Sequence, residues 1–164
     1  MKKLVTISRE YGSGGRIIGR LIAEKLGVPF YDKEIIDMAV EKSGLSREVI
    51  ETAELRAKSN FTYTLSSAMN FGEGVGGDAV SMNEKLFITQ FDIISQIGDL
   101  GEGVIVGRCA DYILKDMPGV TNVFIHGELE DRIKRCTEIY GEEPETIKNT
   151  IATYDKARAN YYNY

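Results

Sequence analysis

The chain has 164 residues, of which 43% are hydrophobic and 27% are charged, and its formal net charge is −5. This composition fits one globular domain with a sizeable core, and the negative charge argues against non-specific nucleic-acid binding, which needs a basic surface. No apolar run approaches the roughly 18 residues of a membrane span, and MKKLVTISRE is not a signal peptide. Because neither cysteine stands in a metal-binding or disulfide pattern, we expect a cytoplasmic protein without a membrane partner.

The first predicted elements are a strand, a glycine-rich turn and a helix. Residues 4–7 form an apolar β-type run, three glycines and Arg16 follow, and apolar residues then recur at helical spacing as far as Leu26. A turn of this kind gathers backbone N–H groups around an anion, and the helix N-terminus adds its positive dipole end. We therefore predict a phosphate cradle made of Gly12, Ser13, Gly14, Gly15 and Arg16.

The turn departs from the usual P-loop pattern, G-x-x-x-x-G-K-[ST]. Gly15 stands where the lysine is expected, and Ile17 stands near the place of the hydroxyl that binds magnesium. Arg16 comes one residue late, but its guanidinium can reach the same phosphate with two donors. The alternative is a glycine-rich turn without a ligand, although a plain turn needs fewer glycines than this one has.

The next part of the chain is predicted to be mainly helical. Gly27 ends the first helix, a short extended piece follows, and Asp32 is expected to cap a second helix over 33–42. A further helix is expected to start near Ser46. Residues 59–77 show no periodicity, which predicts a loop that acts as a hinge or a cover over a site.

Strands and helices alternate again in the second half. A long helix is expected over 83–100, buried strands over 104–106 and 122–126, and further helices over 110–114, 129–140 and 145–162. This alternation predicts an α/β fold with a parallel sheet between layers of helices. Ligands of such sheets bind beyond the carboxyl ends of the strands. We therefore expect the residues that follow each strand to meet the glycine-rich turn at one edge, namely Gly107 with Arg108 and His126 with Gly127.

Four segments carry a family resemblance, in the same order along the chain: ISREYGSGGRIIGRLIAEKLGVPFYDKEII, VIVGRCADYIL, VFIHGELEDRIKR and DKARANYYNY. Together they resemble the cytidylate kinase-like family of P-loop nucleoside monophosphate kinases. The resemblance implies a single three-layer P-loop kinase domain over 1–164, with a small helical acceptor-binding insert near 31–82 and a lid near 137–164. It also implies a further strand and helix after the last residue of this chain.

The resemblance implies a set of acceptor-binding residues. Gly107 and Arg108 match the Gly-Arg of the acceptor motif of true cytidylate kinases, and Asp155 and Arg158 match an Asp-x-x-Arg of the lid region. Asp32 matches the aspartate that opens the acceptor-binding segment. In these kinases the lid pair grips the acceptor and the transferring phosphate, so these five residues are the expected substrate site.

The resemblance also implies residues that serve ATP. Arg132 lies where related kinases place an arginine against the adenine ring, and Arg16 and Arg158 are the expected catalytic cations. Arg132 and Arg158 each have an alternative explanation. Arg132 has Glu128 one helical turn before it, so a solvated ion pair explains it as well, and Arg158 is as readily paired with Asp155 along their helix.

Three departures from true cytidylate kinases leave the activity open. Cys109 replaces the aspartate after Gly-Arg, Lys33 replaces an acceptor-binding serine, and Val106 leaves no carboxylate to organise magnesium, so no metal-ligating residue is predicted. We expect a kinase that uses ATP and Mg²⁺ to phosphorylate a small nucleotide, with CMP or a related nucleoside monophosphate as first choice. The alternatives are a non-catalytic nucleotide-binding module, a kinase for a different small metabolite, and an anion-binding or structural protein. No pattern decides whether the chain forms a homo-oligomer.

Overall fold

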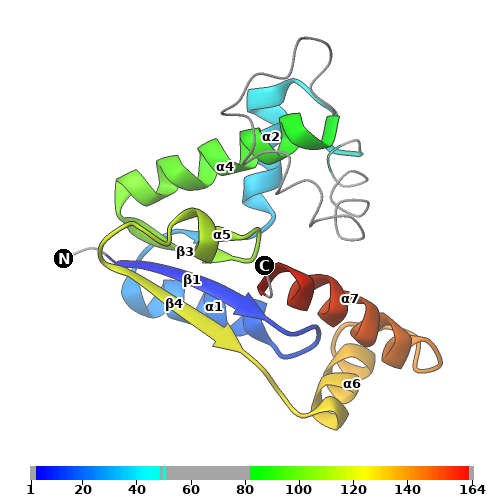
Figure 1. Cartoon of the computed structure of the whole chain (residues 1–164). Coiled ribbons are helices and arrows are strands. Elements are labelled where there is room, and N and C mark those ends of the chain that lie inside the picture. The colour runs from blue at the N-terminus through cyan, green and yellow to red at the C-terminus, as the bar shows by residue number, and fades with distance from the viewer. Residues whose placement is uncertain (1–2, 49, 51–81, 163–164) are drawn as a thin grey trace. The chain divides into compact units, whose positions relative to one another are not determined.

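The computed structural model describes residues 3–48, 50 and 82–162 (Figure 1). The elements in chain order are β1 (Lys3–Arg9), α1 (Gly15–Leu26), β2 (Phe30–Tyr31), α2 (Glu34–Ser43), α4 (Met82–Leu100), β3 (Glu102–Val106), α5 (Ala110–Ile113), β4 (Val120–Ile125), α6 (Leu129–Glu138) and α7 (Ile147–Tyr162). The loop expected over 59–77, and most of the helix expected after Ser46, lie outside the described residues.

The chain divides into two units. The first contains Met1–Asp32 and Ile94–Lys156, and the second contains Lys33–Ile93 and Ala157–Tyr164. Within the parts of both units that the structure describes, no helix combines the length and the hydrophobicity that crossing a bilayer would require.

The first unit is built on a four-stranded sheet with the order β2-β3-β1-β4, in which every pair is parallel. In the centre of this sheet, Ile7 of β1 stands opposite Val106 of β3 and Val123 of β4. A parallel pair needs a crossover connection, and the helices between the strands supply it. The predicted α/β class, with a parallel sheet flanked by helices, is confirmed.

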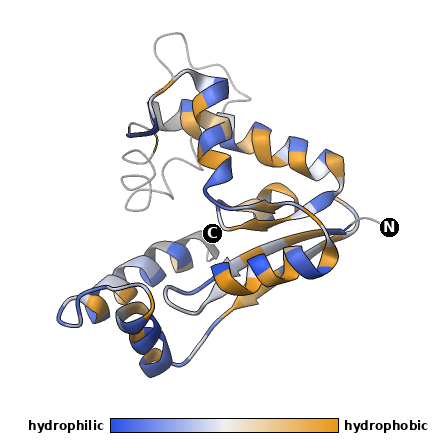
Figure 2. Cartoon of the chain, turned by 180° about the vertical axis from the view of Figure 1, so that it is seen from behind, coloured by the Kyte–Doolittle hydropathy of each residue, from blue (hydrophilic) through white to orange (hydrophobic). Residues whose placement is uncertain are grey.

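The strands alternate their side chains between the two faces of the sheet. One face packs against α1 through a core of buried residues: Val5, Ile7, Ala23, Val104 and Val106. On the other face, Leu4 and Thr6 are buried, and the Thr6 hydroxyl donates a hydrogen bond of 2.6 Å to Asn122 Oδ1. Figure 2 shows that α6, by contrast, is largely hydrophilic.

The prediction of a buried strand over 122–126 is wrong in its burial. The strand β4 spans Val120–Ile125, none of its residues is fully buried, and Phe124 is 50% exposed. The reason is its place in the sheet, because among the described strands β4 pairs only with β1. An edge strand keeps one side open, so its apolar run does not signal complete burial.

In the second unit, α2 and the N-terminal half of α4 carry the described core. Ile35, Ile36, Ala39, Ile50, Leu86 and Ile93 are buried there, whereas Phe91 is 40% exposed. Lys42 of α2 and Asp92 of α4 form an ion pair of 3.5 Å. The predicted cap at Asp32 is wrong, because α2 begins after Lys33 and no side chain caps it.

Candidate functional site

The glycine-rich turn joins the end of β1 to the start of α1. Gly14 precedes the helix in a left-handed conformation, no side chain caps α1, and its first turn holds no acidic residue. The first N–H groups of a helix have no intrahelical acceptor, and here no carboxylate of the helix itself competes for them. The positive end of the α1 helix dipole is therefore available to bind an anion.

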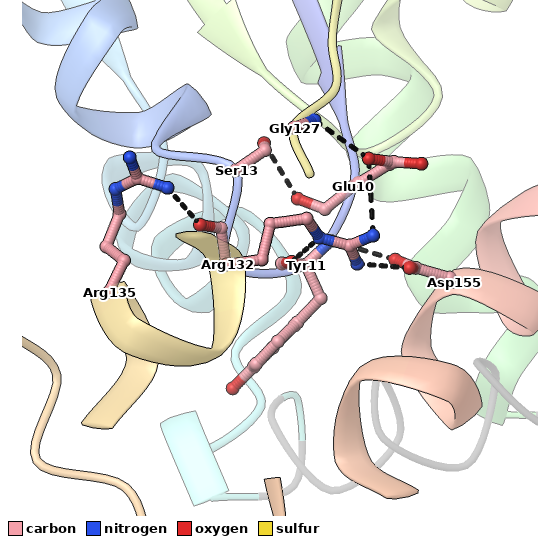
Figure 3. Close-up of polar contacts among 8 residues, drawn as sticks. Glu10, Tyr11, Ser13, Gly127, Arg132, Arg135 and Asp155 are labelled. Atoms are coloured by element: carbon pink, nitrogen blue, oxygen red, sulfur yellow. Dashed lines mark hydrogen bonds and ion pairs between the residues drawn. The ribbon is translucent and has the colours of Figure 1, made fainter. Parts of the chain in front are cut away.

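Two features of the turn require glycine at position 12: its backbone conformation and the close approach of α6. Its φ is +75°, and a Cβ at this position would lie 2.7 Å from Cys136 Sγ and 2.9 Å from the Arg132 carbonyl oxygen. Real Cβ atoms do not approach other atoms so closely, so α6 packs directly on the backbone of the turn. From the same helix, Arg135 Nη1 donates a hydrogen bond of 2.7 Å to the Gly12 carbonyl (Figure 3).

Glu10 and Ser13 shape the turn from within. The Glu10 carboxylate accepts a hydrogen bond of 3.0 Å from the Gly127 N–H, which lies after β4. The Ser13 hydroxyl donates to the Glu10 carbonyl at 2.9 Å, and the Ser13 N–H points to the same oxygen at 3.4 Å. Ser13, predicted to hold phosphate, is thus buried with its hydroxyl directed at the loop's own backbone (Figure 3).

Arg132 is buried at the base of the turn and makes a network of charged contacts (Figure 3). Its Nε donates to the Tyr11 carbonyl at 2.7 Å, its Nη1 lies 3.3 Å from Glu10 Oε2, and its Nη2 pairs with Asp155 of α7. These partners replace the solvated pair with Glu128 that the helical spacing suggested. A contact between Arg132 and adenine stays a prediction.

Tyr11 connects the turn to α7 and to the segment that joins α6 and α7. Its ring stacks on Tyr154 with a centroid distance of 4.5 Å, and its hydroxyl donates a hydrogen bond of 2.8 Å to Glu142. Burial of the phenol raises the pKa of Tyr11, and the hydrogen bond to the Glu142 carboxylate raises it further, because both disfavour the phenolate.

A second cluster lies where β2 and β3 end. Arg16 Nε is 2.6 Å from the carboxylate of Asp32, whose side chain is only 9% exposed, and Arg108 Nε donates to the Asp32 carbonyl at 3.2 Å. The structure thus brings Arg16 together with two of the predicted acceptor residues. Gly107, Arg108 and Cys109 have φ values of 76°, 55° and 58°, which is a run of three left-handed residues. Non-glycine residues in this conformation cluster at functional sites.

The described carboxylates near the turn do not fit a magnesium site built by the protein. Glu10 and Asp155 are paired with Arg132, and Asp32 is paired with Arg16. Among the described residues, no group of three His, Cys, Asp or Glu side chains is placed to hold a metal ion. Arg158 lies on α7, three residues after Asp155, and belongs to the second unit. Its catalytic role stays a prediction.

Three residues of the site were missed in the sequence: Glu10, Tyr11 and Arg135. A signal for the first two existed, because they stand between the end of an apolar strand and the glycines, within SREYGSGGR. Arg135 lies one helical turn after Arg132 on α6, so both arginines reach the same part of the loop.

Comparison with known proteins places this site in a family. A crystal structure of an uncharacterized protein from Eubacterium ventriosum ATCC 27560 is similar to this chain, with a TM-score of 0.64, 28% sequence identity, and coverage of 99% of this chain and 76% of that one. No curated protein matches the chain. The model of the cytidylate kinase-like family matches residues 4–164. With the helix-flanked parallel sheet and the glycine-rich turn after its first strand, this match over nearly the whole chain shows that the protein belongs to the cytidylate kinase-like family.

Proposed function

We propose that this protein transfers the γ-phosphoryl group of MgATP to a small acceptor, with CMP or a related nucleoside monophosphate as the first candidate. The observation that carries the proposal is that two features suited to bind anions lie next to each other in the first unit. The uncapped N-terminus of α1 follows the glycine-rich turn. Arg16 at that terminus forms an ion pair with Asp32, and the Asp32 carbonyl also accepts a hydrogen bond from Arg108. Membership of the cytidylate kinase-like family supports the same class of reaction.

Phosphoryl transfer asks a protein mainly for positioning and positive charge. In our proposal the turn Gly12–Gly15 and the first N–H groups of α1 hold the phosphates of ATP. Arg108 holds the phosphate of the acceptor. Arg16 stands between them, since it starts the helix on the donor side and pairs with Asp32 on the acceptor side. The described carboxylates near the turn are engaged by arginines, so the triphosphate itself would hold Mg²⁺, and the ion would add positive charge near the transferring group.

The test is ADP formation from MgATP, with CMP, dCMP, UMP and AMP offered separately to the full-length protein. Turnover with a pyrimidine acceptor supports the proposal, and Arg16→Ala should lower the rate on the order of 10³-fold if it stabilises the transferring group. The control is Arg20→Ala, which removes an exposed arginine from the same helix. ATP binding without ADP formation would instead favour a non-catalytic module, and no ATP binding would refute the proposal.

A further inference from the structure

Arg9 is the last residue of β1 and takes no part in the phosphate binding proposed for Arg16 and Arg108. The aliphatic part of its side chain packs against the first residue of α1, because a Cβ at Gly15 would lie 2.8 Å from Arg9 Cβ and 2.9 Å from its Cγ. Its guanidinium lies against the turn after β3, because a Cβ at Gly107 would lie 2.9 Å from Arg9 Cζ and 3.2 Å from Nη2. Arg9 therefore fills the space that side chains at positions 15 and 107 would need.

This guanidinium lies where the topology of the sheet places a ligand. β1 and β3 are neighbours in the strand order β2-β3-β1-β4. The connection from β1 leads to β2, on the far side of β3. The connection from β3 leads the opposite way, to β4 on the far side of β1. Where neighbouring parallel strands send their connections in opposite directions, a crevice opens at their carboxyl ends, and ligands bind there. The Gly107 N–H donates to the Ile7 carbonyl at 2.9 Å, so the two strand ends lie side by side at this point.

The spacing of the turn gives Arg9 a counterpart. In the pattern G-x-x-x-x-G-K, the first glycine stands where this chain has Arg9, and the lysine stands where it has Gly15. Glycine and cation have exchanged places between these positions. The short distance between their Cβ positions shows the physical reason, because both side chains would compete for one space.

We propose that Arg9 supplies, from the end of β1, the cation that a lysine supplies from the helix in the usual pattern. In this role its guanidinium contacts the phosphate chain of a nucleoside triphosphate bound at the glycine-rich turn. A planar guanidinium can donate two parallel hydrogen bonds to phosphate oxygens, which a lysine cannot. Arg9 is half-buried, so its surroundings shield its charge from water only in part. This inference rests on the proposed function.

The first experiment measures dissociation constants by calorimetry for MgATP and for inorganic tripolyphosphate, which has no base or sugar. Arg9→Gln should weaken the binding of both at least 10-fold, since a charge-assisted hydrogen bond is lost. Arg9→Lys should recover part of the affinity. Arg20→Gln removes the same charge from an exposed position of α1 and should leave both constants unchanged. Circular dichroism and thermal midpoints establish that each variant is folded.

The second experiment returns the charge to the helix. Arg9→Gly should lose affinity, and Arg9→Gly combined with Gly15→Lys should regain most of it, because the lysine then occupies the vacated space. Gly15→Lys alone should destabilise the fold. If Arg9→Gln binds tripolyphosphate as wild type does, or if the double variant binds no better than Arg9→Gly, the role of Arg9 is refuted while the proposed function stands. If wild type binds neither probe, both proposals fail.

Discussion

Asp155 of α7 pairs with the buried guanidinium of Arg132 through one carboxylate oxygen, and its other oxygen accepts a hydrogen bond of 2.8 Å from the Tyr11 N–H. One side chain thus holds α6 and the glycine-rich turn at the same time. Since Arg132 is 5% exposed, this pair is shielded from the water that weakens surface ion pairs. The shape of the turn therefore depends on a residue far along the chain.

Replacing Asp155 tests this dependence. Asp155→Ala should lower the free energy of unfolding by about 3 kcal/mol, because among the described residues the buried charge of Arg132 then keeps only Glu10 as an acidic partner. Asp155→Asn should cost less, since its amide oxygen can still accept the hydrogen bond from the Tyr11 N–H. Urea unfolding measures both, with the exposed Lys148→Ala as a near-neutral control. An Asn variant as stable as wild type would contradict a role for the charge, whereas equal losses for the Ala and Asn variants would contradict a role for the hydrogen bond from the Tyr11 N–H.

Gly12 and Gly27 give a matched pair of substitutions. Both have positive φ, 75° and 66°, but a Cβ at Gly12 would collide with α6, while a Cβ at Gly27 would meet nothing within 4 Å. Gly27→Ala should cost about 1–2 kcal/mol of stability, for the backbone conformation alone. Gly12→Ala should cost at least 2 kcal/mol more, because α6 must shift. Denaturant unfolding of both variants decides the matter, and similar costs would refute the close approach of α6.

Stability should fall at high pH partly because of Tyr11. The raised pKa means that the folded protein keeps the phenolic proton at pH values where the unfolded chain, with a pKa of about 10, has lost it. This contribution is fully present below pH 10 and is lost as the pH rises above it. Tyr11→Phe should flatten the decline between pH 10 and pH 11 in part only, because burial also raises the pKa of Tyr31. The exposed Tyr140→Phe is the control, and a decline identical to wild type in Tyr11→Phe would speak against this account.

The two thiols should differ sharply in reactivity. Cys136 is 0% exposed, and burial raises the pKa of its thiol, so little reactive thiolate is present near pH 8. Cys109 is partly exposed. Iodoacetamide should therefore modify Cys109 first in the native protein and both residues at similar rates in denaturing urea, as peptide mass spectrometry would record. Rapid native labelling of Cys136 would show that α6 does not pack on the turn as described.

Local signals in the sequence were enough for the order of strands and helices and for the glycine-rich turn, because hydrophobic spacing and glycine positions act over a few residues. They failed where the answer depends on distant partners. The exposure of Phe124 follows from the edge position of β4, and the pairing of Asp32 with Arg16 replaced a helix cap that its neighbours suggested. The partners of Arg132 are likewise remote in sequence: Glu10 and Asp155.

The three left-handed residues after β3 have a consequence for binding. Arg108 and Cys109 hold φ values of 55° and 58°, each at a cost of about 1–2 kcal/mol that the rest of the fold must offset. The turn is therefore already ordered before any ligand arrives, and a ligand that binds there loses less conformational entropy on association. In the proposed function Arg108 holds the phosphate of the acceptor. Glycine at either position would relieve the backbone strain but leave the turn more flexible before binding, so the proposal predicts a more stable protein that binds its acceptor more weakly.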